Sequence, residues 1–294
     1  VGLFIAITFV MFQHSQTGFS FASINKAVRP IFRNHVNYAI MLVALLPYFW
    51  YLIKVSSSRW KWPMLLLFLY LLLAIYLTFT RAAQLTALAA VGIYFTIYFK
   101  WVKQALIASA VFLVFLATFL SYNNRYLDFA PDYEKTITHY KFDDIVAATY
   151  KMQDISTVER FYRWIAGFYM VKEEPLVGYG PSTFYSQYKS HTVTSYKTYV
   201  SDNPEKSGIH NNYLMVTVEQ GIPGLIIMIC LAFFPLIYAE KVYHRLTDMK
   251  EKTLVMAAAI SFAIIDVVIL INDLLEADKV GPFYFLSAAI VVFF

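Results

Sequence analysis

The stretch Trp62–Phe99 reads WPMLLLFLYLLLAIYLTFTRAAQLTALAAVGIYFTIYF, and it decides the fold class. A helix of about 20 apolar residues crosses a bilayer core, so this stretch is too long for a single span. It has no Gly or Pro near its centre, and its one charge is Arg81. The pattern therefore predicts two membrane helices, Trp62–Thr80 and Ala82–Phe99, which meet at a turn around Arg81.

The rest of the chain continues this pattern. Of its 294 residues, 59% are hydrophobic and 15% are charged, which is too little charge to cover a soluble domain of this size. Further spans are predicted at Val1–Phe12, Val36–Ile53, Ala105–Ser121, Ile222–Ala239, Leu254–Ile271 and Val280–Phe294. The expected fold is therefore all-α, a polytopic transmembrane helix bundle. Because the apolar sequence starts at Val1 rather than at a Met, we expect a longer protein whose N-terminal part precedes it.

Basic loops set the expected orientation. Lys and Arg cluster in the short loops at 54–61, 100–103 and 241–252. Alternation of the spans places these loops on one side of the membrane, and an excess of Lys and Arg marks that side as cytoplasmic. Arg33, together with Lys26 and Arg29, falls on the outer side and so needs another role. The net charge of +5 fits such loops and anionic lipid better than nucleic acid.

One long polar segment interrupts the spans. The expected organisation is membrane helices at 1–121, an outer loop at 122–221 and further membrane helices at 222–294. Connections of this length are usually functional, so the loop is expected to carry the chemistry. Within it, Ser156–Glu159 matches a capping box that opens an amphipathic helix, and Glu174-Pro175 ends that helix. We expect this helix to lie along the outer membrane surface.

Two arginines lie on this predicted helix. Arg160 and Arg163 are three residues apart, so they share a face. Guanidinium groups bind phosphate oxygens in bidentate geometry, so such a pair could bind a lipid diphosphate. Contact with ordinary lipid phosphates explains the spacing equally well.

His210 and Arg81 are the other candidates, both at membrane edges. A histidine with a pKa near its usual value of about 6.5 is largely neutral at pH 7 and can accept a proton as a general base. The alternative is a histidine that only caps the following helix. Arg81 is expected to pair with an anion, because charge at membrane depth is costly; the alternative is an arginine that reaches to lipid headgroups.

Weaker candidates complete the survey. Divalent metal could bind Asp143-Asp144 or Asp128 with Asp132, but acidic residues in a long exposed loop are usually solvated, so no metal site is predicted. Sugar rings could stack on Tyr185, Tyr188, Tyr196 or Tyr199, although loop tyrosines more often only pack. Inside a span, Asp266 is expected to pair with a polar partner.

Three sequence elements, in this order and on one predicted side, resemble the O-antigen ligase and polymerase family. They are Arg81-x3-Leu85, Arg160–Trp164 followed by Glu174–Gly180 and Phe184, and His210-x10-Gly221. Each element is weak alone, but the set is fairly specific. The resemblance covers roughly 33–224.

The resemblance implies an inverting glycosyltransferase with a C-type membrane fold, in a bacterial inner membrane with its site on the periplasmic side. The donor would be a glycan on undecaprenyl diphosphate and the acceptor a sugar hydroxyl of lipid A–core, without metal or cofactor. Carried over by position, His210 would be the general base, and Arg81 and Arg160 would hold the diphosphate. Substrate binding is further expected at Arg163, Arg33, Tyr185 and Tyr188.

These residues are compatible with four functions. An O-antigen ligase, an O-antigen polymerase and a protein O-oligosaccharyltransferase would all grip the same kind of donor. The His-x10-Gly spacing favours the ligase. A transporter ranks last, because it should carry broken helices and charges at mid-membrane, whereas the charges here cluster in the outer loop.

Overall fold

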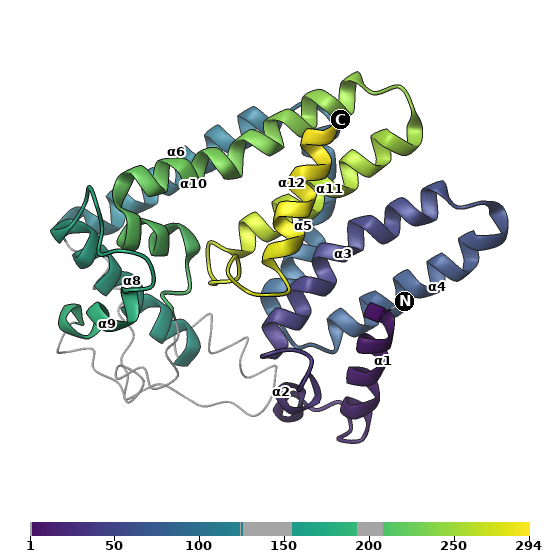
Figure 1. Ribbon diagram of the computed structural model, residues 1–294, viewed down its shortest axis with the longest axis horizontal. Coiled ribbons are helices and arrows are strands. Elements are labelled where there is room, and N and C mark those ends of the chain that lie inside the picture. Colours follow the sequence, from purple (N-terminus) through teal and green to yellow (C-terminus); the bar gives the residue numbers. More distant parts are fainter. Residues whose placement is uncertain (1, 124, 126–154, 193–207) are drawn as a thin grey trace. The chain divides into compact units, whose positions relative to one another are not determined.

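The computed structural model describes residues 2–123, 125, 155–192 and 208–294, and all regular structure in these ranges is helical (Figure 1). The chain forms two compact units. The first contains Val1–Lys103, Phe234–Val268 and Leu274–Phe294, and the second contains Gln104–Phe233 and Ile269–Asp273. The predicted all-α class is confirmed for the described residues.

The first unit is built around one buried helix. Its elements are α1 (Gly2–Ser15), η1 (Phe21–Ser23), α2 (Ile24–Ala27), α3 (His35–Val55), α4 (Ser58–Tyr76), α5 (Arg81–Tyr98), α11 (Met249–Val268) and α12 (Gly281–Phe293). Helix α11 packs against α3, α5 and α12, and α3 also packs against α4. Small residues at 257–259 of α11 are fully buried, which lets neighbouring helices approach closely.

Polar groups inside this unit pair with one another. The Ser261 hydroxyl donates to the Ala44 carbonyl at 2.7 Å. The Tyr284 hydroxyl donates to the Asp266 carboxylate at 3.3 Å, which confirms the expected polar partner of that aspartate. Because an unpaired polar group in an apolar interior is costly, these contacts fix how α11 meets α3 and α12.

The predicted break at Arg81 is also confirmed. Helix α4 ends at Tyr76 and α5 begins at Arg81. Between them, Phe79 has a positive φ of 53°, a conformation that ends helices and that most side chains avoid. The long apolar stretch therefore folds as two helices, as its length requires.

Four helices in the described ranges are long and apolar enough to cross a membrane: α3, α4, α6 (Val102–Ser121) and α10 (Asn212–Arg245). Helices α1 and α12 are shorter but equally apolar in character. The chain thus has the helices of a multi-pass membrane protein. The other predicted spans and the three-part division of the chain stay predictions.

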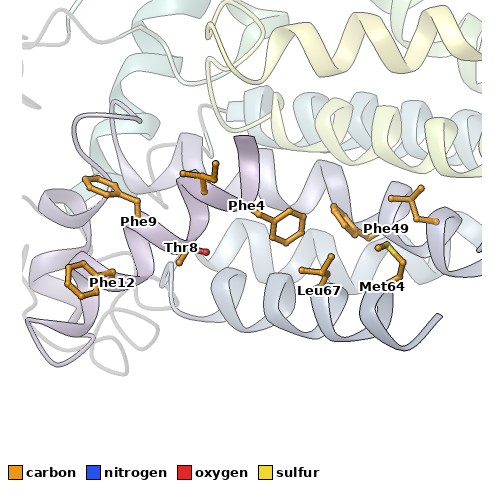
Figure 2. Close-up of a pocket in the computed structure, with 9 residues that line it drawn as sticks. Phe4, Thr8, Phe9, Phe12, Phe49, Met64 and Leu67 are labelled. Carbon is orange, nitrogen blue, oxygen red and sulfur yellow. The ribbon is translucent and has the colours of Figure 1, made fainter. Parts of the chain in front are cut away.

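An open apolar hollow of about 900 Å³ lies among α1, α3 and α4 (Figure 2). Phe4, Phe9 and Phe12 of α1 line it, together with Phe49 of α3 and Met64 of α4. Its one polar lining group is Thr8. Such a surface suits hydrocarbon chains rather than sugars.

The second unit surrounds a separate hydrophobic core. It contains most of α6, then α8 (Ile155–Glu173), α9 (Phe184–Tyr188), η4 (Lys189–His191) and the first part of α10. Its buried core consists of Ala166, Met170, Phe184, Tyr188, Ile209, Leu214 and Val218. These residues come from α8, α9, the start of α10 and the turn before it, so one core positions the two arginines and the histidine.

Candidate functional site

A hydrogen-bonded loop ties the end of α8 to the middle of α10. Helix α8 ends at Glu173, as the following Glu174-Pro175 predicts. The backbone N–H of Tyr179 donates to the Val218 carbonyl at 2.9 Å, and the N–H of Gly180 donates to the Glu219 carbonyl at 2.9 Å. In return, the Ile222 N–H donates to the Pro175 carbonyl at 2.8 Å. These contacts occupy the backbone groups that a break in α10 would otherwise leave unpaired.

Two glycines make this close approach possible. Gly221 interrupts α10 with φ 68° and ψ −171°, and a Cβ there would lie 2.3 Å from the Leu176 carbonyl oxygen. Gly178 has φ 69°, and its Cβ would lie 2.6 Å from the Glu219 backbone. Only glycine fits both the conformation and the space. The Gly221 of the His-x10-Gly element therefore sets the register between α8 and α10.

His210 lies on a tight turn just before α10. Its φ is 58°, in the left-handed region. The Asn211 side chain caps α10 by accepting from the Leu214 N–H at 3.0 Å. The carboxylate of Asp273 accepts the N–H groups of His210 at 2.7 Å and of Asn211 at 2.8 Å. The turn is thus held by a side chain from the segment that follows α11.

Arg163 holds the same turn from the other side. Its side chain is only 2% exposed, and its Nη1 donates to the Gly208 carbonyl at 3.0 Å. Glu159, one turn earlier on α8, lies 3.9 Å from its guanidinium. The shared face predicted for Arg160 and Arg163 is present, but Arg163 reaches the backbone before His210. Arg163 therefore contacts this turn directly, and its part in substrate binding stays a prediction.

The charges of α8 act on the His210 imidazole. Burial, followed by the positive charges of Arg160 and Arg163, lowers the pKa of His210 to about 3. The side chain nevertheless keeps 31% of its surface exposed, so a ligand can reach it. The two guanidinium charges disfavour the protonated ring, and a bound anion would offset their effect.

The remaining predicted residues lie in different places. Arg81 starts α5 in the first unit, where its charge adds to the positive end of the helix dipole. Arg33 is exposed just before α3, also in the first unit. Tyr185 is half-buried on α9, whereas Tyr188 is 1% exposed and packs in the core, the alternative considered for loop tyrosines. The following predicted residues lie outside the described ranges: Asp128, Asp132, Asp143, Asp144, Tyr196 and Tyr199.

One polar cluster was not predicted from the sequence. The carboxylate of Glu173 lies 2.9 Å from both the Tyr179 hydroxyl and the His191 Nε2. These hydrogen bonds, first from His191 and then from Tyr179, lower the pKa of Glu173. His191 lies 18 residues after Glu173, so no helical spacing in the sequence predicts this contact. The cluster anchors η4 to the end of α8.

The fold and this site together define a class: a multi-pass helical membrane protein whose second unit brings cationic side chains to a histidine. A family model described as O-antigen ligase (Wzy_C) matches residues 66–229, more than half of the chain, and the protein belongs to this family. No protein of curated function matches the sequence. Membership indicates a glycan-transferring membrane enzyme that acts on lipid-linked glycans.

Proposed function

We propose that this protein is an O-antigen ligase of the bacterial inner membrane. It would transfer a polysaccharide from undecaprenyl diphosphate to a sugar hydroxyl of lipid A–core on the periplasmic face, with inversion at the anomeric carbon. One observation carries the proposal: in a chain of this family, His210 shares one compact unit with Arg160 and Arg163, whose charges act on its ring.

In this mechanism the acceptor hydroxyl oxygen attacks the anomeric carbon of the donor. The bond between that carbon and the diphosphate oxygen breaks, and the hydroxyl proton passes to His210. The products are the glycosylated lipid A–core and undecaprenyl diphosphate with one more negative charge. Proton abstraction by a positioned base contributes roughly 10²–10⁴-fold to such reactions.

The arginines stabilise the leaving diphosphate. Fixed cations placed near developing negative charge supply much of the rate enhancement when a phosphate or diphosphate group leaves. Arg160 is our choice on the second unit, since it is only partly buried whereas Arg163 is fully buried. For Arg81, which belongs to the first unit, a role at the diphosphate follows from the family resemblance alone. Guanidinium groups suit this task because they stay charged and bind phosphate with two donors.

Arg160 and Arg163 couple the base to the donor. Without a ligand they help to lower the pKa of His210 to about 3, which makes the imidazole a weak base. A bound diphosphate neutralises their charge, so the pKa of the ring rises. His210 therefore becomes an effective base only when the donor is in place, which protects the donor from unproductive chemistry.

Replacement of the base tests the proposal. His210→Ala should abolish transfer of the glycan to lipid A–core while the protein remains folded and inserted. The matched control is His244→Ala, a histidine on the last turn of α10 whose ring contacts the Ile97 carbonyl. Normal decoration of lipid A–core by the His210 variant, measured on a lipopolysaccharide gel, would refute the assignment of the base.

A deletion strain separates the ligase from its two enzymatic alternatives. Loss of a ligase leaves bare core together with accumulated lipid-linked polymer. Loss of a polymerase leaves core that carries a single repeat unit. Unchanged lipopolysaccharide with a missing glycoprotein identifies a protein O-oligosaccharyltransferase. Only the first pattern supports the proposed function.

A further inference from the structure

The segment that follows α11 lies directly against the His210 turn. The Asn212 N–H donates to the Ile269 carbonyl at 2.9 Å. Four residues later, the two oxygens of Asp273 accept the N–H groups of His210 and Asn211, at 2.7 and 2.8 Å. Both residues that donate to the carboxylate lie in the same compact unit as Asp273. The carboxylate thus determines the backbone path at the proposed base.

The backbone at Gly208 is held closely between Asp273 and Arg163. A Cβ on Gly208 would lie 2.4 Å from the Asp273 Oδ2, so the chain passes the carboxylate at a position where only glycine fits without a shift. On the other side, Arg163 grips the Gly208 carbonyl at 3.0 Å. The left-handed φ of 58° at His210 is held between these two contacts.

Asp273 also faces the His210 ring. Its Oδ2 lies 3.9 Å from the Nδ1 of His210, within the range of an ion pair but longer than a hydrogen bond. Its side chain is 18% exposed, so water screens the attraction only in part. Among the described residues, the charged groups around the ring include this carboxylate, the guanidinium groups of Arg160 and Arg163 on α8, and Glu159 behind Arg163.

We propose that Asp273 is a positioning residue for the His210 base, which fixes the turn and stabilises the imidazolium formed when the acceptor hydroxyl loses its proton. The inference rests on the proposed function. It concerns a residue outside the 66–229 range that matches the family. In serine hydrolases a buried carboxylate orients an imidazole and stabilises its charged form in a comparable way.

The test is a pH profile of the full-length protein in proteoliposomes, with undecaprenyl-diphosphate-linked glycan as donor and lipid A–core as acceptor. Asp273→Asn keeps one oxygen acceptor but removes the charge. We expect its kcat to fall about tenfold or more while the donor KM changes little. Loss of the anion makes the imidazolium less stable, so the acidic limb of the kcat profile should move to lower pH.

A matched control comes from the neighbouring turn. Asp278 is 75% exposed and pairs with Lys279, so Asp278→Asn should leave both the rate and the pH profile unchanged. A wild-type rate for Asp273→Asn would overturn the inference. So would a lower rate with an unmoved acidic limb, because that result describes a purely structural role.

Two further variants test the inference if Asp273→Asn does not fold and separate it from the proposed function. If Asp273→Asn does not fold, Gly208→Ala displaces the carboxylate without removing its charge, and it should lower kcat while the protein still inserts. A normal kcat in that variant would then overturn the inference. His210→Ala separates the two proposals: activity in that variant refutes the proposed base, whereas an inactive His210→Ala beside a normal Asp273→Asn refutes only the role of Asp273.

Discussion

The interior of the first unit and the His210 turn of the second unit use polar groups in opposite ways. Around α11, the described polar groups hydrogen-bond to one another, as in Asp266 with Tyr284 and Ser261 with both the Ala44 carbonyl and Ser287. At the turn, two arginine charges act on a neutral imidazole, and a strained backbone is held by Asp273. Hydrogen bonds of the first kind stabilise packing, whereas a histidine with a strongly lowered pKa in a strained backbone marks a candidate ligand site.

The largest effect on the transfer rate in this comparison is expected at Arg160, beside the His210 turn. Arg160→Ala should lower the transfer rate about 100-fold or more, because it removes a fixed cation from the leaving diphosphate. The measurement is the initial rate of transfer in proteoliposomes. Lys172→Ala is the control, since Lys172 is an exposed cation near the end of the same helix. Equal rates for the two variants would show that the charge of Arg160 has no special role.

The next effect is a loss of stability at Gly221, where the loop after α8 contacts α10. Gly221→Ala places a side chain in a conformation reserved for glycine and against the Leu176 carbonyl, so we expect it to destabilise the protein by about 3 kcal/mol or more. Gly92→Ala in α5 is the control, because its Cβ would meet nothing within 4 Å. Thermal midpoints in detergent compare them. A Gly221 variant as stable as the Gly92 variant would contradict the proposed interlock of α8 and α10.

The smallest effect is expected at the Glu173 cluster. Glu173→Gln weakens hydrogen bonds at an exposed site, and exposed pairs contribute little, so the transfer rate should stay within about twofold of the wild type. The lowered pKa of Glu173 means that its contribution to stability is present above its ordinary pKa and is lost as the pH falls through the lowered value. A rate loss as large as that of Arg160→Ala would bring this cluster into the catalytic site.

The sequence predicted the parts of the molecule that depend on local signals. Apolar run length located the helices, and charge located the break at Arg81. Glu174-Pro175 located the end of α8, because proline restricts the residue before it.

The contacts between distant segments could not be predicted in the same way. Asp273 belongs to an acidic turn that orientation rules explain without any partner, yet it binds the backbone of His210. Spacing on a helix predicted that Arg160 and Arg163 share a face, but it gave no sign that Arg163 is buried and donates to the Gly208 carbonyl. The spacing from His210 to Gly221 was visible as a motif, whereas its physical reason, the insertion of the loop at Leu176, needed the fold.

The most direct test of the central claim is the titration of His210 by NMR, in histidine-labelled protein assigned with the His210→Ala variant. In the free protein the ring should stay neutral down to about pH 4, because its pKa is about 3. Saturation with undecaprenyl diphosphate should raise that pKa by about one unit or more, as the lipid anion neutralises the arginines. An ordinary pKa in the free protein, or a pKa that the lipid leaves unchanged, would contradict the account.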